Sequence, residues 1–181
     1  MGQHWKAGAE MNDIKLATVP QLIDHIKSGD PQRIIEAARE CALRQEASAA
    51  PYMLDILRVT CNAAVRNAVA LALSDLKHPS AFALLVDLLK SDHTRESRGT
   101  LLYALGAYDC SPILPLLVDL LIDGNFEVSR QAYSLISGIE TALDDRVWES
   151  CRERLRSAIM VATEDRRPIL EELLKLFEQD E

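Results

Sequence analysis

The chain has 181 residues and a formal net charge of −8, a length that fits one domain or a short repeat array. Hydrophobic residues make up 48% of it and charged residues 27%, which excludes an intrinsically disordered chain. The acidic balance argues against broad nucleic-acid binding, because a negative surface repels phosphate backbones. Aromatic residues reach only 5% and alanine and leucine dominate, which favours helix over sheet.

The amino-terminal residues 1–18 contain no apolar stretch of signal-peptide length, and no run of about 18 apolar residues occurs along the chain. We therefore expect a cytoplasmic protein that does not cross a membrane, with residues 1–18 forming a tail or a partial cap helix. The cysteines lie far apart without CxxC spacing, so reduced thiols are expected. They are Cys41, Cys61, Cys110 and Cys151.

A repeat of about 32 residues runs through the middle of the chain. Residues 84–108 align with residues 116–140 without a gap, and both segments begin with LLVDLL and share a Ser-Arg pair. An earlier copy occupies residues 52–76, and a weaker copy, in which Ile35 replaces the arginine, occupies residues 19–43. Shared polar and apolar columns over gapless copies indicate a true structural repeat.

Each copy has the pattern of two helices joined by a turn. In the third copy, Phe82, Leu85 and Leu89 recur at steps of three and four residues, which places them on one helix face. The polar residues 91–94 then interrupt the pattern, and a second helix is expected from about Arg95 to Ala107. Helix pairs of this size cannot bury their apolar faces alone, so they must stack into a solenoid.

The carboxy-terminal part departs from the repeat. Residues 147–159 and 168–177 form two amphipathic patterns, the second with charged residues on its outer side. The sequence therefore predicts an all-α solenoid of roughly ten helices in antiparallel pairs. Four repeats are expected over residues 19–143, followed by a capping helix pair over residues 144–181.

The second helices of the repeats carry a family resemblance. Their sequences, VRNAVALALSDL (65–76), SRGTLLYALGAY (97–108) and SRQAYSLISGIE (129–140), resemble the second helix of HEAT repeats, especially the subset shared with phycobilisome lyase subunits. The resemblance covers residues 19 to 140. It implies an armadillo-like α-solenoid that acts as an adaptor, scaffold or inhibitor and holds a partner on its concave face.

Two columns of the repeat have structural interpretations. Arg66, Arg98 and Arg130 match the arginine of the family. They form either a ladder, in which each guanidinium bonds carboxylates or helix-end carbonyls of a neighbouring repeat, or a row of anchors for a partner. Gly106, Gly138 and Ser74, which form a column of small residues, are expected to allow close packing between helices.

A third column is a candidate partner-binding surface. If Val69 and Leu73 belong to the buried stripe of their helix, a second stripe faces the opposite way at 100° per residue. This stripe is either a groove for a partner or an interface between adjacent repeats. Its members are Asn67, Leu71, Tyr103, Gln131 and Leu135.

The sequence contains no pattern typical of an enzyme or a metal site. No HExxH, GxxxxGK[ST] or GxGxxG motif occurs, and the cysteines have no histidine at helical spacing. We therefore predict no catalytic, cofactor-binding or metal-binding residues and no cofactor.

The resulting functional prediction is a non-catalytic protein-protein interaction module, such as an adaptor, an assembly factor or an immunity-type inhibitor. Its acidic surface favours a basic protein partner, with neither nucleic acid nor membrane involved. The alternative, which rests on the type of repeat, is a subunit of a phycobilin lyase-like enzyme that attaches a chromophore.

Overall fold

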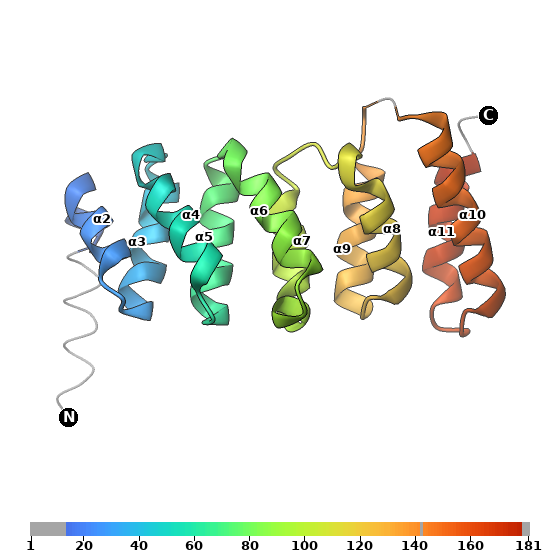
Figure 1. Ribbon diagram of the computed structural model, residues 1–181, viewed down its shortest axis with the longest axis horizontal. Helices are drawn as coiled ribbons and strands as arrows, with labels where there is room; N and C mark the ends of the chain where they lie inside the picture. Colours follow the sequence, from blue (N-terminus) through green and yellow to red (C-terminus); the bar gives the residue numbers. More distant parts are fainter. Residues whose placement is uncertain (1–13, 142, 179–181) are drawn as a thin grey trace. The chain divides into compact units, whose positions relative to one another are not determined.

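The computed structural model describes residues 14–141 and 143–178. These residues form the ten α-helices α2–α11 and a short helical segment at residues 14–16, joined in places by short 3-10 helices, and contain no strand (Figure 1). The predicted all-α, HEAT-like solenoid of about ten helices is thereby confirmed. Contacts between Cα atoms divide the chain into two compact units, Met1–Ala107 and Tyr108–Glu181.

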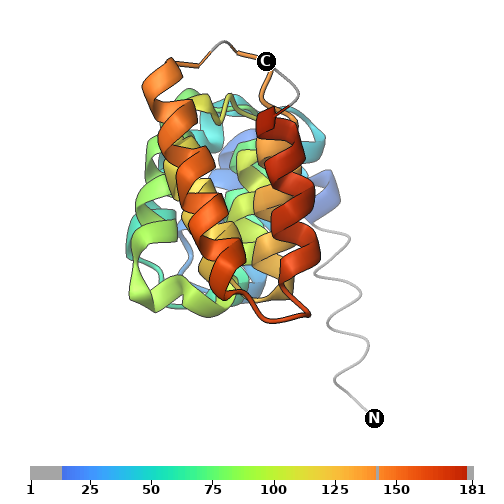
Figure 2. The ribbon, with the colours of Figure 1, turned by 90° about the vertical axis from the view of Figure 1, so that its right-hand side faces the viewer.

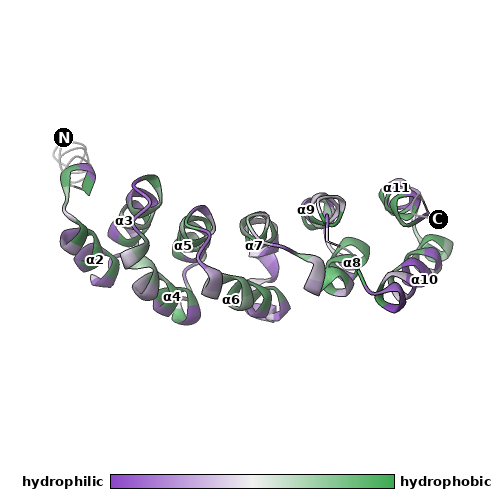
Figure 3. Ribbon diagram, turned by 90° about the horizontal axis from the view of Figure 1, so that it is seen from above, coloured by the Kyte–Doolittle hydropathy of each residue, from purple (hydrophilic) through white to green (hydrophobic). Residues whose placement is uncertain are grey.

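The first unit contains three helix pairs in two layers. Its helices are α2 (Val19–Lys27), α3 (Pro31–Leu43), α4 (Ala50–Val59), α5 (Ala63–Asp75), α6 (Pro79–Lys90) and α7 (Arg98–Leu105). Within this unit, Figure 3 shows the first helices α2, α4 and α6 in one layer and the second helices α3, α5 and α7 in the other. Because α5 packs against both α3 and α7, the second helices form a continuous layer.

The core of the first unit includes Leu85 and Leu89, which the helical spacing predicts, whereas Phe82, predicted on the same face, is half-buried. Leu85 and Leu89 of α6 are fully buried, as are Leu73 of α5 and Leu102 of α7. Each buried leucine stabilises the fold by about 1.5–3 kcal/mol relative to an exposed one. This burial fixes which sides of α5 and α7 are left to face outward.

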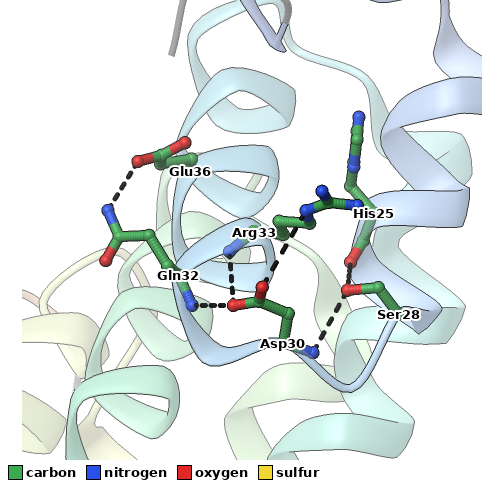
Figure 4. Close-up of polar contacts among 6 residues, drawn as sticks. All are labelled: His25, Ser28, Asp30, Gln32, Arg33 and Glu36. Atoms are coloured by element: carbon green, nitrogen blue, oxygen red, sulfur yellow. Dashed lines mark hydrogen bonds and ion pairs between the residues drawn. The ribbon is translucent and has the colours of Figure 1, made fainter. Parts of the chain in front are cut away.

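Polar residues at the turns fix where the helices begin. Asp30 precedes α3, and its Oδ1 accepts hydrogen bonds from the backbone N–H groups of Gln32, at 2.9 Å, and Arg33, at 3.4 Å (Figure 4). Pro31 occupies the first position of the helix, where a missing N–H has no cost. Asn62 caps α5 in the same way. Asp30 and Asn62 are therefore N-caps of α3 and α5. The turn predicted at residues 91–94 has no side-chain cap hydrogen bond at Ser91 or at Ser97, the residue before α7.

The second helix of the third copy begins three residues later than predicted, at Arg98. A 3-10 helix, Asp92–Ser97, precedes it. The side chain of Thr94 is buried, and its hydroxyl donates to the carbonyl oxygens of Leu88 and Ser91 at the end of α6. These bonds tie the connection to α6, which explains why regular α-helix starts only after Ser97.

The second unit contains two helix pairs. Its helices are α8 (Leu114–Asp123), α9 (Phe126–Ser137), α10 (Asp145–Val161) and α11 (Arg167–Glu178). Within this unit α8 packs against α9 and against α10, and α10 packs against α11. Figure 2 shows α10 and α11 side by side and antiparallel.

Specific side-chain contacts hold α10 in this unit. The rings of Trp148 in α10 and Phe177 in α11 stack with centroids 4.0 Å apart. Arg156 pairs with Glu178 of α11 at 3.0 Å, and Arg154 pairs with Asp119 of α8. These contacts tie α10 to both of its neighbours, α8 and α11.

The expectation of close packing holds for Ser74, which is buried and donates to the Ala104 carbonyl oxygen of α7 at 2.7 Å. It is wrong for Gly106 and Gly138. Both residues are exposed, and a Cβ added at Gly138 meets only the carbonyl oxygens of Ser134 and Leu135, at 3.5 and 3.7 Å. Gly124, between α8 and α9, does need the absence of a side chain. A Cβ there would come within 2.5 Å of Val128 Cγ1, because α9 turns back closely against α8.

Candidate functional site

Tyr103 is the most conspicuous member of the predicted partner-binding column. Its side chain is 65% exposed, whereas Leu101, Leu102, Ala104 and Leu105 on the same helix are buried. α7 thus buries nearly all its apolar residues and leaves one large aromatic ring in contact with solvent. Such a ring combines apolar area with a hydroxyl, which is typical of residues that concentrate binding energy.

Asn67 and Leu71 are half-buried on α5, which packs directly against α7. The amide Oδ1 of Asn67 is buried and has no hydrogen-bond partner among the described residues. A buried acceptor without a donor costs about 1–3 kcal/mol. The part of the column that lies in the first unit therefore joins an exposed aromatic residue, a partly exposed leucine and an unsatisfied amide.

Gln131 and Leu135, the two remaining members of the column, belong to α9 in the second unit. Both are half-buried. Neither residue is part of the lining of a cleft described below, although Gln131 lies one helical turn before Ser134, which is. The predicted column is therefore divided, with three members in the first unit and two in the second.

The three arginines of the repeat occupy three different environments. Arg66 is only 5% exposed, and its Nη2 donates to Ser97 Oγ in the next repeat at 2.8 Å. Arg98 is half-buried and donates through Nε to the carbonyl oxygen of Leu89 at the end of α6, at 2.9 Å. Arg130 is exposed, and its guanidinium lies 5.7 Å from the ring centroid of Phe126.

Two further arginines, which the repeat pattern does not single out, cap helix ends. Arg44 donates to the carbonyl oxygens of Ile14, Lys15 and Ala17. Arg166, between α10 and α11, donates to three carbonyl oxygens at the end of α8, those of Leu121, Ile122 and Gly124, and to Ser129 Oγ. No arginine lies about 32 residues before or after either of them, so the sequence repeat does not identify these two residues.

A cleft of about 890 Å³ opens between α9 and α11 in the second unit. The wall from α9 includes Phe126, Arg130 and Tyr133. The opposite wall includes Asp165, Ile169 and Glu172, from the start of α11 and the connection before it. A cavity of this volume, with aromatic and aliphatic side chains and a few polar groups, has the size and lining of a ligand or peptide site.

The charges in the cleft are unevenly compensated. The Tyr133 hydroxyl donates to Glu172 Oε1 at 3.2 Å, which joins the two walls. Within the described residues, neither Glu172 nor Asp165 forms an ion pair with a basic side chain. By contrast, Arg166 is surrounded by helix-end carbonyls, which carry partial negative charge. The cleft thus contains two carboxylates without a cationic partner.

The negative charge of the protein is concentrated in the second unit. Residues 108–181 contain 16 acidic and 8 basic side chains, whereas residues 1–107 contain 12 of each. The first unit is formally neutral, and the net charge of −8 therefore belongs to the unit that contains the cleft. A field of this sign attracts cationic partners at long range.

Three of the four cysteines are poorly suited to nucleophilic chemistry. All four are thiols, and burial raises the pKa values of Cys41, Cys110 and Cys151 to about 11. The reactive thiolate form is therefore scarce at neutral pH. Over the described ranges, no group of three or more His, Cys, Asp or Glu side chains is arranged to hold a metal ion. None of the described helices combines the length and apolar character needed to cross a bilayer.

Comparison with known families agrees with the helix pairs of the first unit. Residues 19–106 match HEAT repeats. The match begins at the start of α2 and ends one residue before the boundary of the first unit. The column residues Asn67, Leu71 and Tyr103 belong to this HEAT-repeat segment, and the α9–α11 cleft lies outside it. A search of curated proteins returned no match.

Proposed function

We propose that the chain is a protein-binding module without catalytic chemistry of its own. Support comes from the HEAT-repeat segment, since arrays of stacked helix pairs commonly present extended surfaces to protein partners. The four thiols, none of them in a disulfide, favour a reducing, cytoplasmic location. The proposed contact surface is the outward side of the second helices.

The observation that carries this proposal is the exposure of Tyr103. A stability role for the ring would require burial between helices, yet it is 65% exposed beside the half-buried Leu71 and Asn67. Exposed aromatic groups of this kind cost solubility and are typical of binding surfaces. Gln131 and Leu135 remain part of the proposal as contacts in the second unit.

Site-specific photo-crosslinking tests the proposal. A benzophenone amino acid replaces Tyr103 in one variant and Val59 in a control variant. Val59 is 77% exposed at the end of α4, in the other layer of the first unit. In extracts of the native host, position 103 should crosslink to one defined protein that position 59 does not capture. Equal crosslinking from both positions, or none from position 103, would contradict the proposed surface.

The capping pair is a further part of this proposal. Residues 144–181 are proposed to end the array, because the outward residues Glu171, Lys175 and Glu178 of α11 are charged and exposed. A polar outer face keeps the last helix pair of a solenoid soluble. Residues 19–143 would then constitute the four repeats.

The second candidate function, a subunit of a phycobilin lyase, rests on the resemblance of the second helices to those of lyase subunits. It predicts that a bilin mixed with the purified protein undergoes a shift in absorbance. The interaction-module proposal predicts an unchanged spectrum.

A further inference from the structure

We propose that the α9–α11 cleft binds a basic segment of a partner protein, in which arginine or lysine side chains flank an apolar or aromatic one. The proposal deepens the proposed protein-binding function and rests on it. It adds a second contact, in the acidic unit and outside the HEAT-repeat segment, and it specifies the chemistry of the segment that occupies it.

The first argument is the apolar lining. Phe126 is 75% exposed at one end of the cleft, and Tyr133 and Ile169 are half-buried along its two walls. A volume of about 890 Å³ accommodates several side chains at once. Covering these rings and Ile169 removes apolar surface from water, which supplies most of the affinity in peptide recognition.

The second argument is that the walls are held in place before anything binds. Arg166 fastens the connection before α11 to the carbonyl oxygens at the end of α8. The Trp148–Phe177 stack fixes α11 against α10. A preformed cleft spares a ligand the entropy of ordering its own site.

The third argument is charge. Asp165 and Glu172 line one wall without an ion-pair partner in the described residues, and the surrounding unit has twice as many acidic as basic side chains. The charge of Arg166 is directed at helix-end carbonyls. Arg130, on the other wall, lies near the ring of Phe126, where a cation is attracted to the ring face. Arg130 also forms no ion pair within the described residues, so the case for a cationic segment rests on Asp165, Glu172 and the acidic excess of the whole unit.

Fluorescence anisotropy with two labelled peptides tests this inference. Both peptides have the same length and the same apolar residues, and one carries arginines and lysines where the other carries glutamates. The basic peptide should bind the full-length protein, and its affinity should fall between about 0.05 M and about 0.5 M salt because the ion pairs are screened. Binding of the acidic peptide with equal or higher affinity would overturn the inference.

A matched pair of double variants separates the cleft from the general acidity of the unit. Asp165→Asn with Glu172→Gln removes two charges from the cleft, and Asp145→Asn with Glu153→Gln removes two from exposed positions of α10. The first pair should weaken the basic peptide roughly five- to tenfold, which corresponds to two exposed ion pairs. The second should leave affinity nearly unchanged. Equal losses of affinity from both double variants would mean that the peptide responds only to the net charge of the protein, which would contradict the proposed cleft site.

Failure of this inference can be distinguished from failure of the proposed function. A benzophenone amino acid at Ser134, an exposed residue that lines the cleft, reports any protein that enters it. Protein capture at position 134 that is insensitive to the Asp165 and Glu172 changes would leave protein binding standing and refute the basic occupant. Capture at position 103 with none at position 134 would refute the cleft as a contact.

Discussion

Nη2 of Arg66 donates a 2.8 Å hydrogen bond to Oγ of Ser97, a residue 31 positions later in the chain. Both side chains are buried, so the bond ties α5 to the residue that precedes α7. Ser129 is the equivalent of Ser97 in the next copy of the repeat, and its hydroxyl accepts from Arg166 at 3.2 Å. The two equivalent serines thus accept a hydrogen bond from an arginine of different origin. The donor to Ser97 comes from the preceding repeat, and the donor to Ser129 comes from the α10–α11 connection.

Replacement of the three repeat arginines should give graded losses of stability. Arg66→Ala removes a buried hydrogen bond to Ser97 and leaves a space, and should cost about 2–3 kcal/mol. Arg98→Ala removes one half-buried bond to a carbonyl and should cost about 1–2 kcal/mol. Arg130→Ala, at an exposed position, should stay within about 0.5 kcal/mol. Urea denaturation measures all three, and a reversed order would contradict the assigned environments.

Arg166→Ala should destabilise the second unit. The substitution leaves the carbonyl oxygens at the end of α8 without their donor, and loss of such charge-assisted bonds should cost roughly 2–3 kcal/mol. The exposed Arg167, whose contact is a 3.3 Å bond to the nearby Ala162 carbonyl, is the matched control and should tolerate alanine. Thermal melts that show similar effects at both positions would argue against the clamp.

Gly124→Ala and Gly138→Ala should differ although both glycines follow helices. At Gly124 an added Cβ meets the Leu120 carbonyl oxygen and, at 2.5 Å, Val128 Cγ1, so α9 must shift and stability should fall by about 1–3 kcal/mol. At Gly138 the nearest atom is 3.5 Å away, and the change should be within about 0.5 kcal/mol. Chemical denaturation of the two variants measures the difference.

Tyr103→Ala should weaken partner binding and leave the fold intact. The ring is 65% exposed, so its removal should change stability by no more than about 0.5 kcal/mol. If it anchors a partner, affinity should fall by about 2 kcal/mol, or roughly thirtyfold. Val59→Ala provides a control for loss of exposed apolar area in the other layer. A large drop in melting temperature for Tyr103→Ala would instead identify the ring as part of the packing.

The buried thiols should make stability depend on pH above about 9. In the unfolded chain a cysteine has a pKa near 9.0, whereas burial raises the pKa of Cys41 and Cys151 to about 11. Between these values the unfolded state has released protons that the folded state still holds, so stability is complete below pH 9 and falls as the pH rises toward 11. Cys41→Ser with Cys151→Ser should flatten this part of the stability profile.

The four cysteines should differ in their reactivity toward thiol reagents. Cys61 is exposed, whereas Cys41, Cys110 and Cys151 are buried. A thiol reagent at pH 8 should therefore modify one cysteine in the native protein and all four after denaturation. Cys61→Ser should abolish the native reaction. Rapid modification of two or more thiols in the folded protein would contradict the assigned burial.

The sequence by itself was sufficient for the helix pairs and their order. A helix face repeats every 3.6 residues, and turn residues cap the helix that follows them, so both signals are local in the chain. The 32-residue offset showed which residues of one copy correspond to which residues of the next. The helical spacing within a copy predicted that Leu85 and Leu89 belong to the core, and both are fully buried. The exception was the start of α7, which the buried Thr94 moves to Arg98.

Only the tertiary structure decided what the repeated side chains do. Arg66, Arg98 and Arg130 share one sequence column, yet the first is buried, the second bonds a helix-end carbonyl and the third is exposed. The cleft depends on Arg166 and on the packing of α10 between α8 and α11, and neither follows the period. A repeated residue has the same environment in each copy only where the helices packed against it also belong to the repeat. The α10–α11 pair does not follow the repeat, so the residues next to it have a different environment.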